Sequence, residues 1–137
     1  MGAQSIEQGI SQDLVLDAGA LIAYERGNRA VRETIHDAVV DHFTEITVPA
    51  GVLAQVWRGG PRSALLARLL DGFDIDSLDG PRAKEVGLRL GTRDAADVID
   101  AHIVCCAIER RADIITSDPD DLAALVDTDE PISLIAV

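Results

Sequence analysis

Hydrophobic and polar positions follow two different periods along this chain. Short, nearly continuous apolar runs predict buried strands at residues 13–16, 45–48, 114–116 and 132–137. Between them, apolar residues recur at helical spacing, and we expect helices over residues 18–25, 29–43, 49–57, 62–70, 79–91, 94–111 and 119–126. Strands that alternate with helices favour an α/β fold, in which a mainly parallel central sheet carries helices on both faces.

One further segment, residues 73–78, alternates apolar and acidic side chains. Phe73 and Ile75 fall on one side of such a strand, and Asp74 and Asp76 fall on the other. This pattern predicts an edge strand whose acidic face is in contact with water.

The length of the chain, 137 residues, fits one domain. We expect residues 1–12 to be a flexible N-terminal lead and residues 13–137 to form the domain. No apolar run approaches the roughly 20 residues that cross a bilayer, so no membrane association is expected. Cys105 and Cys106 are neighbours in a predicted helix, where they cannot easily bond to each other. Reduced cysteines are typical of a cytoplasmic protein.

The formal net charge of −12 is unusual for a protein that binds nucleic acid. The charge is unevenly distributed, because the segment from Asp94 to the C-terminus has 11 acids and only two arginines. The earlier part is nearly balanced, and 11 of the 12 basic residues are arginines, whose planar fork can bind two phosphate oxygens at once. The composition therefore argues against nonspecific coating of DNA, but it is compatible with a metal site that binds a few phosphates.

Two aspartates directly follow predicted strands. Asp17 ends the first strand, and Asp118 comes two residues after the strand at 114–116. Ligand sites of parallel sheets lie outside the carboxyl ends of the strands, which makes both residues candidates for a site. Each could instead be the N-cap of the helix that follows it.

The long helix predicted at 94–111 carries two more candidates. With about 100° per residue, Asp97 and Asp100 fall on the same face as the apolar residues of that helix, while His102 and Cys106 fall on the opposite, outer face. Carboxylates on a buried face are costly unless they are paired or bound to a cation, and two that lie one turn apart repel each other. An arginine partner, or a helix end that opens into solvent, is the alternative explanation.

Taken together, these acids come from two strand ends and one helix face. Hard oxygen ligands from several elements suit Mg²⁺ or Mn²⁺, and no Cys/His spacing typical of zinc is present. A metal held there would bind phosphate oxygens and activate water for in-line attack.

Three segments resemble the motifs of PIN domains: LVLDAGALIA at residues 14–23, VPAGVLAQVWRGG at 48–60 and DVIDAHIVCCAIERRADIITSDPDDL at 97–122. The resemblance covers residues 14–137, and small bacterial members of the family are similar to VapC-type toxins. It implies an endoribonuclease that depends on Mg²⁺ or Mn²⁺, acts on RNA such as tRNA or rRNA, pairs with a VapB-like antitoxin and forms a homodimer.

Carried over motif by motif, the resemblance implies that Asp17, Asp100 and Asp118 are catalytic and bind metal, with Asp97 as a further metal ligand. Asp121 would be a supporting acid. Thr116 and Ser117 could hydrogen-bond a phosphate or a metal-bound water, although helix capping explains Ser117 nearly as well.

One position departs from the family pattern. The second motif usually carries a glutamate, and this chain has Gln55 there. An amide can accept a hydrogen bond or offer its carbonyl to a metal, but it supplies no charge. The alternative to an active nuclease is therefore a catalytically weakened module that binds an antitoxin or RNA without cleaving. Arg58 and Arg62, which follow this motif, could contact RNA phosphates or acidic groups of an antitoxin.

Overall fold

A computed structural model describes residues 13–42 and 44–137, without the side chains of residues 41, 42 and 62. The expectation of a flexible lead at residues 1–12 lies outside this range. The strands are β1 (Leu14–Leu16), β2 (Ile46–Pro49), β3 (Asp74–Asp76), β4 (Asp113–Thr116) and β5 (Leu134–Ala136). The helices are α2 (Ala18–Glu25), α3 (Arg29–His42), α4 (Ala50–Val56), α5 (Gly60–Leu69), α6 (Gly80–Thr92), α7 (Val98–Arg110) and α8 (Pro119–Ala123).

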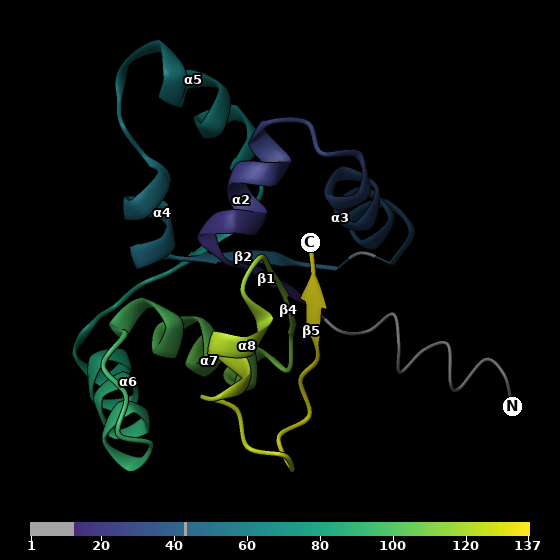
Figure 1. Cartoon of the computed structure of the whole chain (residues 1–137). Coiled ribbons are helices and arrows are strands. Elements are labelled where there is room, and N and C mark those ends of the chain that lie inside the picture. The colour runs from purple at the N-terminus through teal and green to yellow at the C-terminus, as the bar shows by residue number, and fades with distance from the viewer. Residues whose placement is uncertain (1–12, 43) are drawn as a thin grey trace, which may run out of the picture.

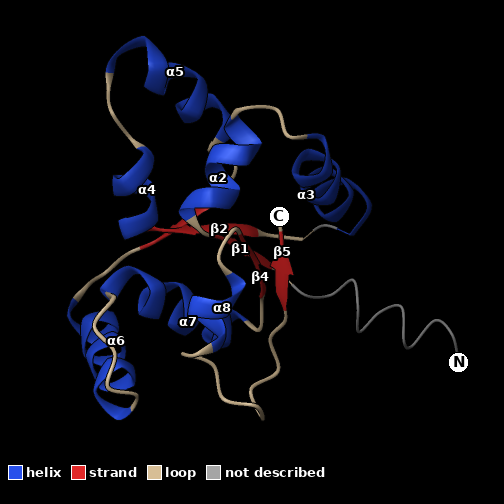
Figure 2. Ribbon diagram, viewed as in Figure 1, coloured by secondary structure: helices blue, strands red, loops and turns tan. Residues whose placement is uncertain are grey.

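The five strands form one sheet in the order β3-β2-β1-β4-β5, and every neighbouring pair is parallel. Helices α2 to α5 lie on one side of the sheet and α6 to α8 on the other (Figures 1 and 2). The predicted α/β class, with a parallel sheet covered on both faces, is confirmed. The order of the strands reverses direction between β1 and β4, which is the switch point where open α/β sheets bind their ligands.

The core is aliphatic, as the scarcity of aromatic residues requires. β1, β2 and β4 contribute side chains that are fully or almost fully buried, among them Val15, Leu16, Val48 and Ile114. Strands covered on both faces need apolar residues at successive positions, which explains why these runs are continuous rather than alternating.

Helix α7 differs from its prediction in two respects. It begins at Val98 rather than at residue 94, because Asp97 is the N-cap and its Oδ1 accepts a hydrogen bond from the Asp100 amide at 2.9 Å. His102 and Cys106 are fully buried, so their expected place on an outer face is wrong. The physical reason is that α7 packs against the sheet on one side and against α6 and α8 on others, which leaves its middle no wet face.

Strand β3 is an edge strand, as predicted, and Asp74 is exposed and Phe73 half-buried, as expected, but the next two residues differ from the prediction. Asp76 is 6% exposed and Ile75 is 41% exposed. The alternation in the sequence identified the strand correctly, and the prediction of a solvent-facing carboxylate is wrong for Asp76 alone. Asp76 can be buried because three cationic or hydrogen-bonding side chains from the neighbouring helices reach it.

Candidate active site

Asp17 occupies the switch point of the sheet. It follows the last residue of β1, is 7% exposed, and its main-chain amide donates to Ile115 O of β4 at 3.2 Å. Its Oδ1 accepts from the Ala20 amide at 2.7 Å, so Asp17 is the N-cap of α2 that one reading of the sequence expected. The other carboxylate oxygen is directed across to the end of β4.

The end of β4 holds that second oxygen. Asp17 Oδ2 accepts hydrogen bonds from Thr116 Oγ1 at 2.5 Å and from the Ser117 amide at 3.1 Å. Thr116 is fully buried, and its hydroxyl also accepts from the Asp118 amide at 2.8 Å. Thr116 thus links Asp17 to the backbone of Asp118, and it fixes the positions of both rather than facing a ligand itself.

Gly19 allows the first turn of α2 to approach this loop closely. A Cβ atom placed on Gly19 would lie 1.9 Å from Ser117 Oγ. No side chain fits there without a shift of the loop, so the glycine keeps the ends of β1 and β4 together.

Asp100 faces four other acids. The residue is half-buried, one turn into α7, and burial is the largest of the effects that raise its pKa to about 6. The charges of Asp97, Asp121, Asp118 and Asp17 raise it further, in that order. The structure therefore brings together the acids that the sequence singled out on β1, β4 and α7, with Asp121 of α8 beside them.

Asp118 and Asp121 interact directly. Asp118 holds the N-cap position of α8, but its side chain makes no capping hydrogen bond, so capping does not account for this residue. A hydrogen bond with Asp121 raises the pKa of the Asp118 carboxyl, and the charges of Asp121, Asp120 and Asp17 act in the same direction. Two carboxyl groups this close repel each other when both are charged, so a cation beside them would be favourable.

Within the described part of the chain, no ion pair reaches any of these five acids. No described arginine is the partner that could have explained Asp100. Among the described residues, no three or more His, Cys, Asp or Glu side chains are already close enough together to hold a metal ion. The donor set nevertheless fits a divalent metal in kind, because the carboxylates of Asp97, Asp121, Asp118 and Asp17 act on Asp100 and no described cation compensates them.

The other residues that the sequence predicted for the site are Gln55, Arg58 and Arg62, and no described contact joins the first two to the acids. Gln55 is exposed on α4 and lines a small hollow with Ile22, Glu25, Arg26, Val56 and Arg58, and no described hydrogen bond joins it to the acids. Arg58 donates to the carbonyls of Ala54 and Trp57 at 3.3 and 2.7 Å. The side chain of Arg62 lies outside the described residues.

A second charged cluster was missed by the sequence analysis. Asp76 accepts two hydrogen bonds from Arg82, at 3.0 and 3.1 Å, one from Arg110 at 3.1 Å, and lies 2.7 Å from His102 Nε2. Burial alone would raise the pKa of Asp76, but the bonds from Arg82, His102 and Arg110 outweigh it and hold the pKa at about 2. We call Asp76, Arg82, His102 and Arg110 the Asp76 hub. Its members come from β3, α6 and α7, so the periodicity of any one element could not have revealed it.

A parallel sheet with carboxylates from β1, β4 and α7 at its switch point defines the class of protein: an α/β domain with an acidic site at the carboxyl edge. The chain belongs to the PIN domain family, whose sequence model matches residues 14–127. PIN domains are generally nucleases. No curated protein matches this chain in sequence.

Solved structures show the same fold. The chain is similar to VapBC2 from Rickettsia felis bound to a DNA fragment from their promoter, with a TM-score of 0.67, 13% identity and coverage of 92% of this chain and 99% of that one. It is similar to a toxin–antitoxin complex from Klebsiella pneumoniae, with a TM-score of 0.65, 17% identity and coverage of 88% and 95%. FitAcB from Neisseria gonorrhoeae gives a TM-score of 0.64 at 16% identity, with coverage of 89% and 96%.

Proposed function

We propose that this chain is a metal-dependent endoribonuclease and the toxin of a toxin–antitoxin pair. The observation that carries the proposal is the set of uncompensated carboxylates around Asp100, at the switch point of a PIN domain. A bound Mg²⁺ or Mn²⁺ would supply a Lewis acid for the phosphate and a more acidic water. Asp17, Asp97, Asp100 and Asp118 are the residues that would hold it.

The acids have different local tasks. Asp17 is fixed by three hydrogen bonds from Ala20, Thr116 and Ser117, which makes it a rigid anchor. Asp100 has no described side-chain partner and a pKa of about 6, so near neutral pH it can exchange a proton or accept a cation with little rearrangement. Asp118 and Asp121 are exposed at the mouth of the site, where substrate phosphate would approach.

Cleavage of RNA by purified chain, free of any partner, tests the proposal. A mixed tRNA and rRNA pool is incubated with Mg²⁺ or Mn²⁺, with chelator, and with the Asp100→Asn variant, and single-stranded DNA is the matched substrate control. The Asp129→Asn variant controls for loss of one charge, since Asp129 is an exposed acid near the C-terminus. We expect discrete cuts in RNA that need both metal and Asp100.

The second candidate function is a module that binds RNA or an antitoxin without cleaving, and the amide at Gln55 favours it. It predicts no cutting with either metal from protein whose folding is verified by circular dichroism. That result would overturn the nuclease proposal.

We also propose an antitoxin as partner, because the similar solved structures include toxin–antitoxin complexes. An apolar groove of about 420 Å³ between α2, α3 and α5 supports this, with Val39 and Val40 exposed at 41% and 54%. We expect Val39→Asp to abolish inhibition by a co-expressed antitoxin. Leu88→Asp, which changes an exposed leucine on the other side of the sheet, is the control.

Two further expectations belong to this proposal. A homodimer remains a prediction, which light scattering of the purified chain tests. The described helices include none long and apolar enough to cross a membrane. Both cysteines are buried and unbonded, which supports our proposal that the protein acts in the reducing cytoplasm.

A further inference from the structure

A small hollow between α2 and α4 combines an apolar floor with a charged rim. Its volume is about 160 Å³, and Ile22 and Val56 lie half-buried in it. The rim consists of Glu25, Arg26, Gln55 and Arg58. Two guanidinium groups and one carboxylate make this a cationic spot on a chain whose net charge is −12.

The two arginines of the rim differ from those on the opposite side of the sheet. Arg82, Arg89, Arg93 and Arg110 each form an ion pair with a carboxylate. Among the described residues, neither Arg26 nor Arg58 does so. Arg26 is exposed with no described side-chain bond, and Arg58 uses its guanidinium only on two main-chain carbonyls. Both keep donors for an external anion.

Gln55 lies between these cations. A glutamate at this position would place its charge beside Arg26 and Arg58 and would neutralise one of them. The amide leaves both arginines positive, and its NH₂ group can donate to an anionic oxygen. Two neighbouring guanidinium groups disfavour a metal ion at Gln55, so the residue types of this hollow suit phosphate better than a cation.

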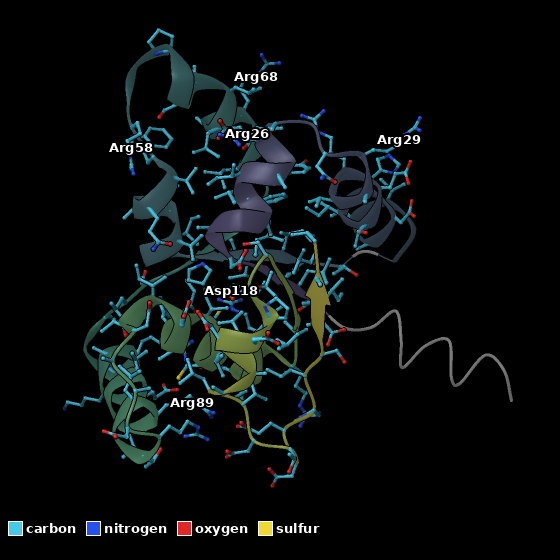
Figure 3. All side chains as sticks on the ribbon, viewed as in Figure 1. Arg26, Arg29, Arg58, Arg68, Arg89 and Asp118 are labelled. Atoms are coloured by element: carbon cyan, nitrogen blue, oxygen red, sulfur yellow. The ribbon has the colours of Figure 1, made fainter. Side chains whose placement is uncertain are left out.

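The hollow lies at the far end of the helix that starts at Asp17. Arg26 is the C-cap of α2 and comes nine residues after Asp17, the N-cap, so a rise of 1.5 Å per residue separates them by about 13 Å. Figure 3 shows Arg26 near the end of α2 that is away from Asp118, and Arg58 near α4, both on the side of the sheet that carries these two helices. A strand whose scissile phosphate lay at the acids could therefore place another phosphate, a few nucleotides away, over the hollow.

We propose that Arg26, Gln55 and Arg58 form a phosphate subsite for single-stranded RNA that enters the acidic site. The inference rests on the proposed nuclease function and names the part of the surface that holds the substrate. It also gives the substitution at Gln55 a role: the position binds the RNA backbone instead of supporting the metal.

Fluorescence anisotropy with a labelled single-stranded RNA of 12 nucleotides tests the subsite independently of cleavage. The experiment uses Asp100→Asn protein with Mg²⁺, which leaves the RNA intact. We expect Arg26→Gln to weaken binding about fivefold at 0.1 M salt and to reduce the slope of log Kd against log salt by about 0.7, the value for one phosphate contact on a single strand. Arg29→Gln, on α3 and paired with Glu33, is the matched control and should change neither.

Arg58 needs a second variant, because its side chain also binds the C-terminal carbonyls of α4. Arg58→Gln removes charge and cap together, whereas Arg58→Lys keeps the charge. If the subsite exists, Arg58→Gln lowers the slope of log Kd against log salt, and Arg58→Lys has the slope of the unmodified chain. If Arg26→Gln and Arg58→Gln bind RNA as tightly as Arg29→Gln, the subsite is wrong, and the two arginines remain available for acidic groups of a protein partner.

The Gln55→Glu variant distinguishes two roles for position 55: part of a phosphate subsite, or a metal ligand that has lost its charge. In the subsite, the new carboxylate neutralises a guanidinium and weakens RNA binding about fivefold, the effect of one lost phosphate contact. When Gln55→Glu is the sole substitution, we expect the affinity for Mn²⁺ to stay within twofold of that of the unmodified chain. Tighter Mn²⁺ binding with faster cleavage at saturating RNA would contradict the proposal. Absence of cleavage by the unmodified chain would refute the nuclease function alone, since the binding measurements do not depend on it.

Discussion

Two carboxylates, buried Asp76 and half-buried Asp100, lie at the carboxyl edge of the same sheet, each in its own charged group, and the two groups differ in what surrounds them. Asp76 at the end of β3 receives hydrogen bonds from Arg82 and Arg110 and contacts His102, and its pKa is about 2. Asp100 is surrounded by acids, and its pKa is about 6. Among the described residues, the protein supplies cations to the first group and none to the second, and this difference supports our proposal that an external cation binds at the second.

The contrast also assigns roles. A carboxylate that is fully paired within the chain stabilises the fold, and here it joins edge strand β3 to α6 and α7. A carboxylate that lowers stability is retained at functional sites, where the cost is offset when a ligand binds. Three experiments test whether the two groups of carboxylates differ in this way.

The largest effect is expected from removing the charge of Asp76. Asp76→Asn leaves Arg82 and Arg110 without their buried partner, and we expect it to lower the free energy of unfolding by about 3–5 kcal/mol in urea denaturation. Asp74→Asn, on the same strand, is the control: Asp74 is 61% exposed and contacts Arg110 at 3.4 Å, so its loss should cost less than about 0.5 kcal/mol. Equal effects of the two variants would refute the role of the Asp76 hub.

Acid provides a second test of the Asp76 hub. The pKa of Asp76 is depressed in the folded chain, so its contribution is complete above the unfolded value of 3.8 and is lost as the pH falls from about 4 to about 2. We expect a loss of about 2 kcal/mol from this group over that range. An NMR titration of the carboxyl ¹³C signals measures it directly, and a midpoint for Asp76 at or above 3.8 would contradict the pairing seen here.

The smallest effect has the opposite sign. Asp100→Asn removes a half-buried charge and relieves repulsion among the acids, and we expect it to raise the free energy of unfolding by about 1 kcal/mol at pH 7 without metal, after allowing for solvent screening. Thermal denaturation should show a higher melting temperature than for Asp129→Asn, which changes an exposed acid outside the site. A clear loss of stability in Asp100→Asn would instead make Asp100 a structural residue.

Much of the fold could be predicted from the sequence, for local physical reasons. Continuous apolar runs identified the central strands, and Asn28, whose Oδ1 accepts from the Val31 amide at 3.1 Å, marked the start of α3. The acids at strand ends were also recognisable, because a parallel sheet collects the carboxyl ends of its strands at one edge.

What the sequence could not predict depends on contacts between distant segments. The period-two pattern of β3 does not say which face is buried, and the burial of Asp76 is decided by Arg82 and Arg110. The sequence predicted that the face of α7 with His102 is exposed, because the periodicity of α7 does not show that α6 packs against it. The same limit applies to Gln55, whose neighbour Arg26 comes from another part of the chain.

The most direct test of the central claim is a calorimetric titration of the chain with Mn²⁺ at pH 7. We predict that the unmodified chain and Asp129→Asn bind Mn²⁺, that binding stabilises them by about 2.7 kcal/mol at a metal concentration of 100 times Kd, and that Asp100→Asn binds at least tenfold more weakly. Mn²⁺ binding that is unchanged in Asp100→Asn, or no binding to the folded unmodified chain, would contradict the claim that these acids form a cation site.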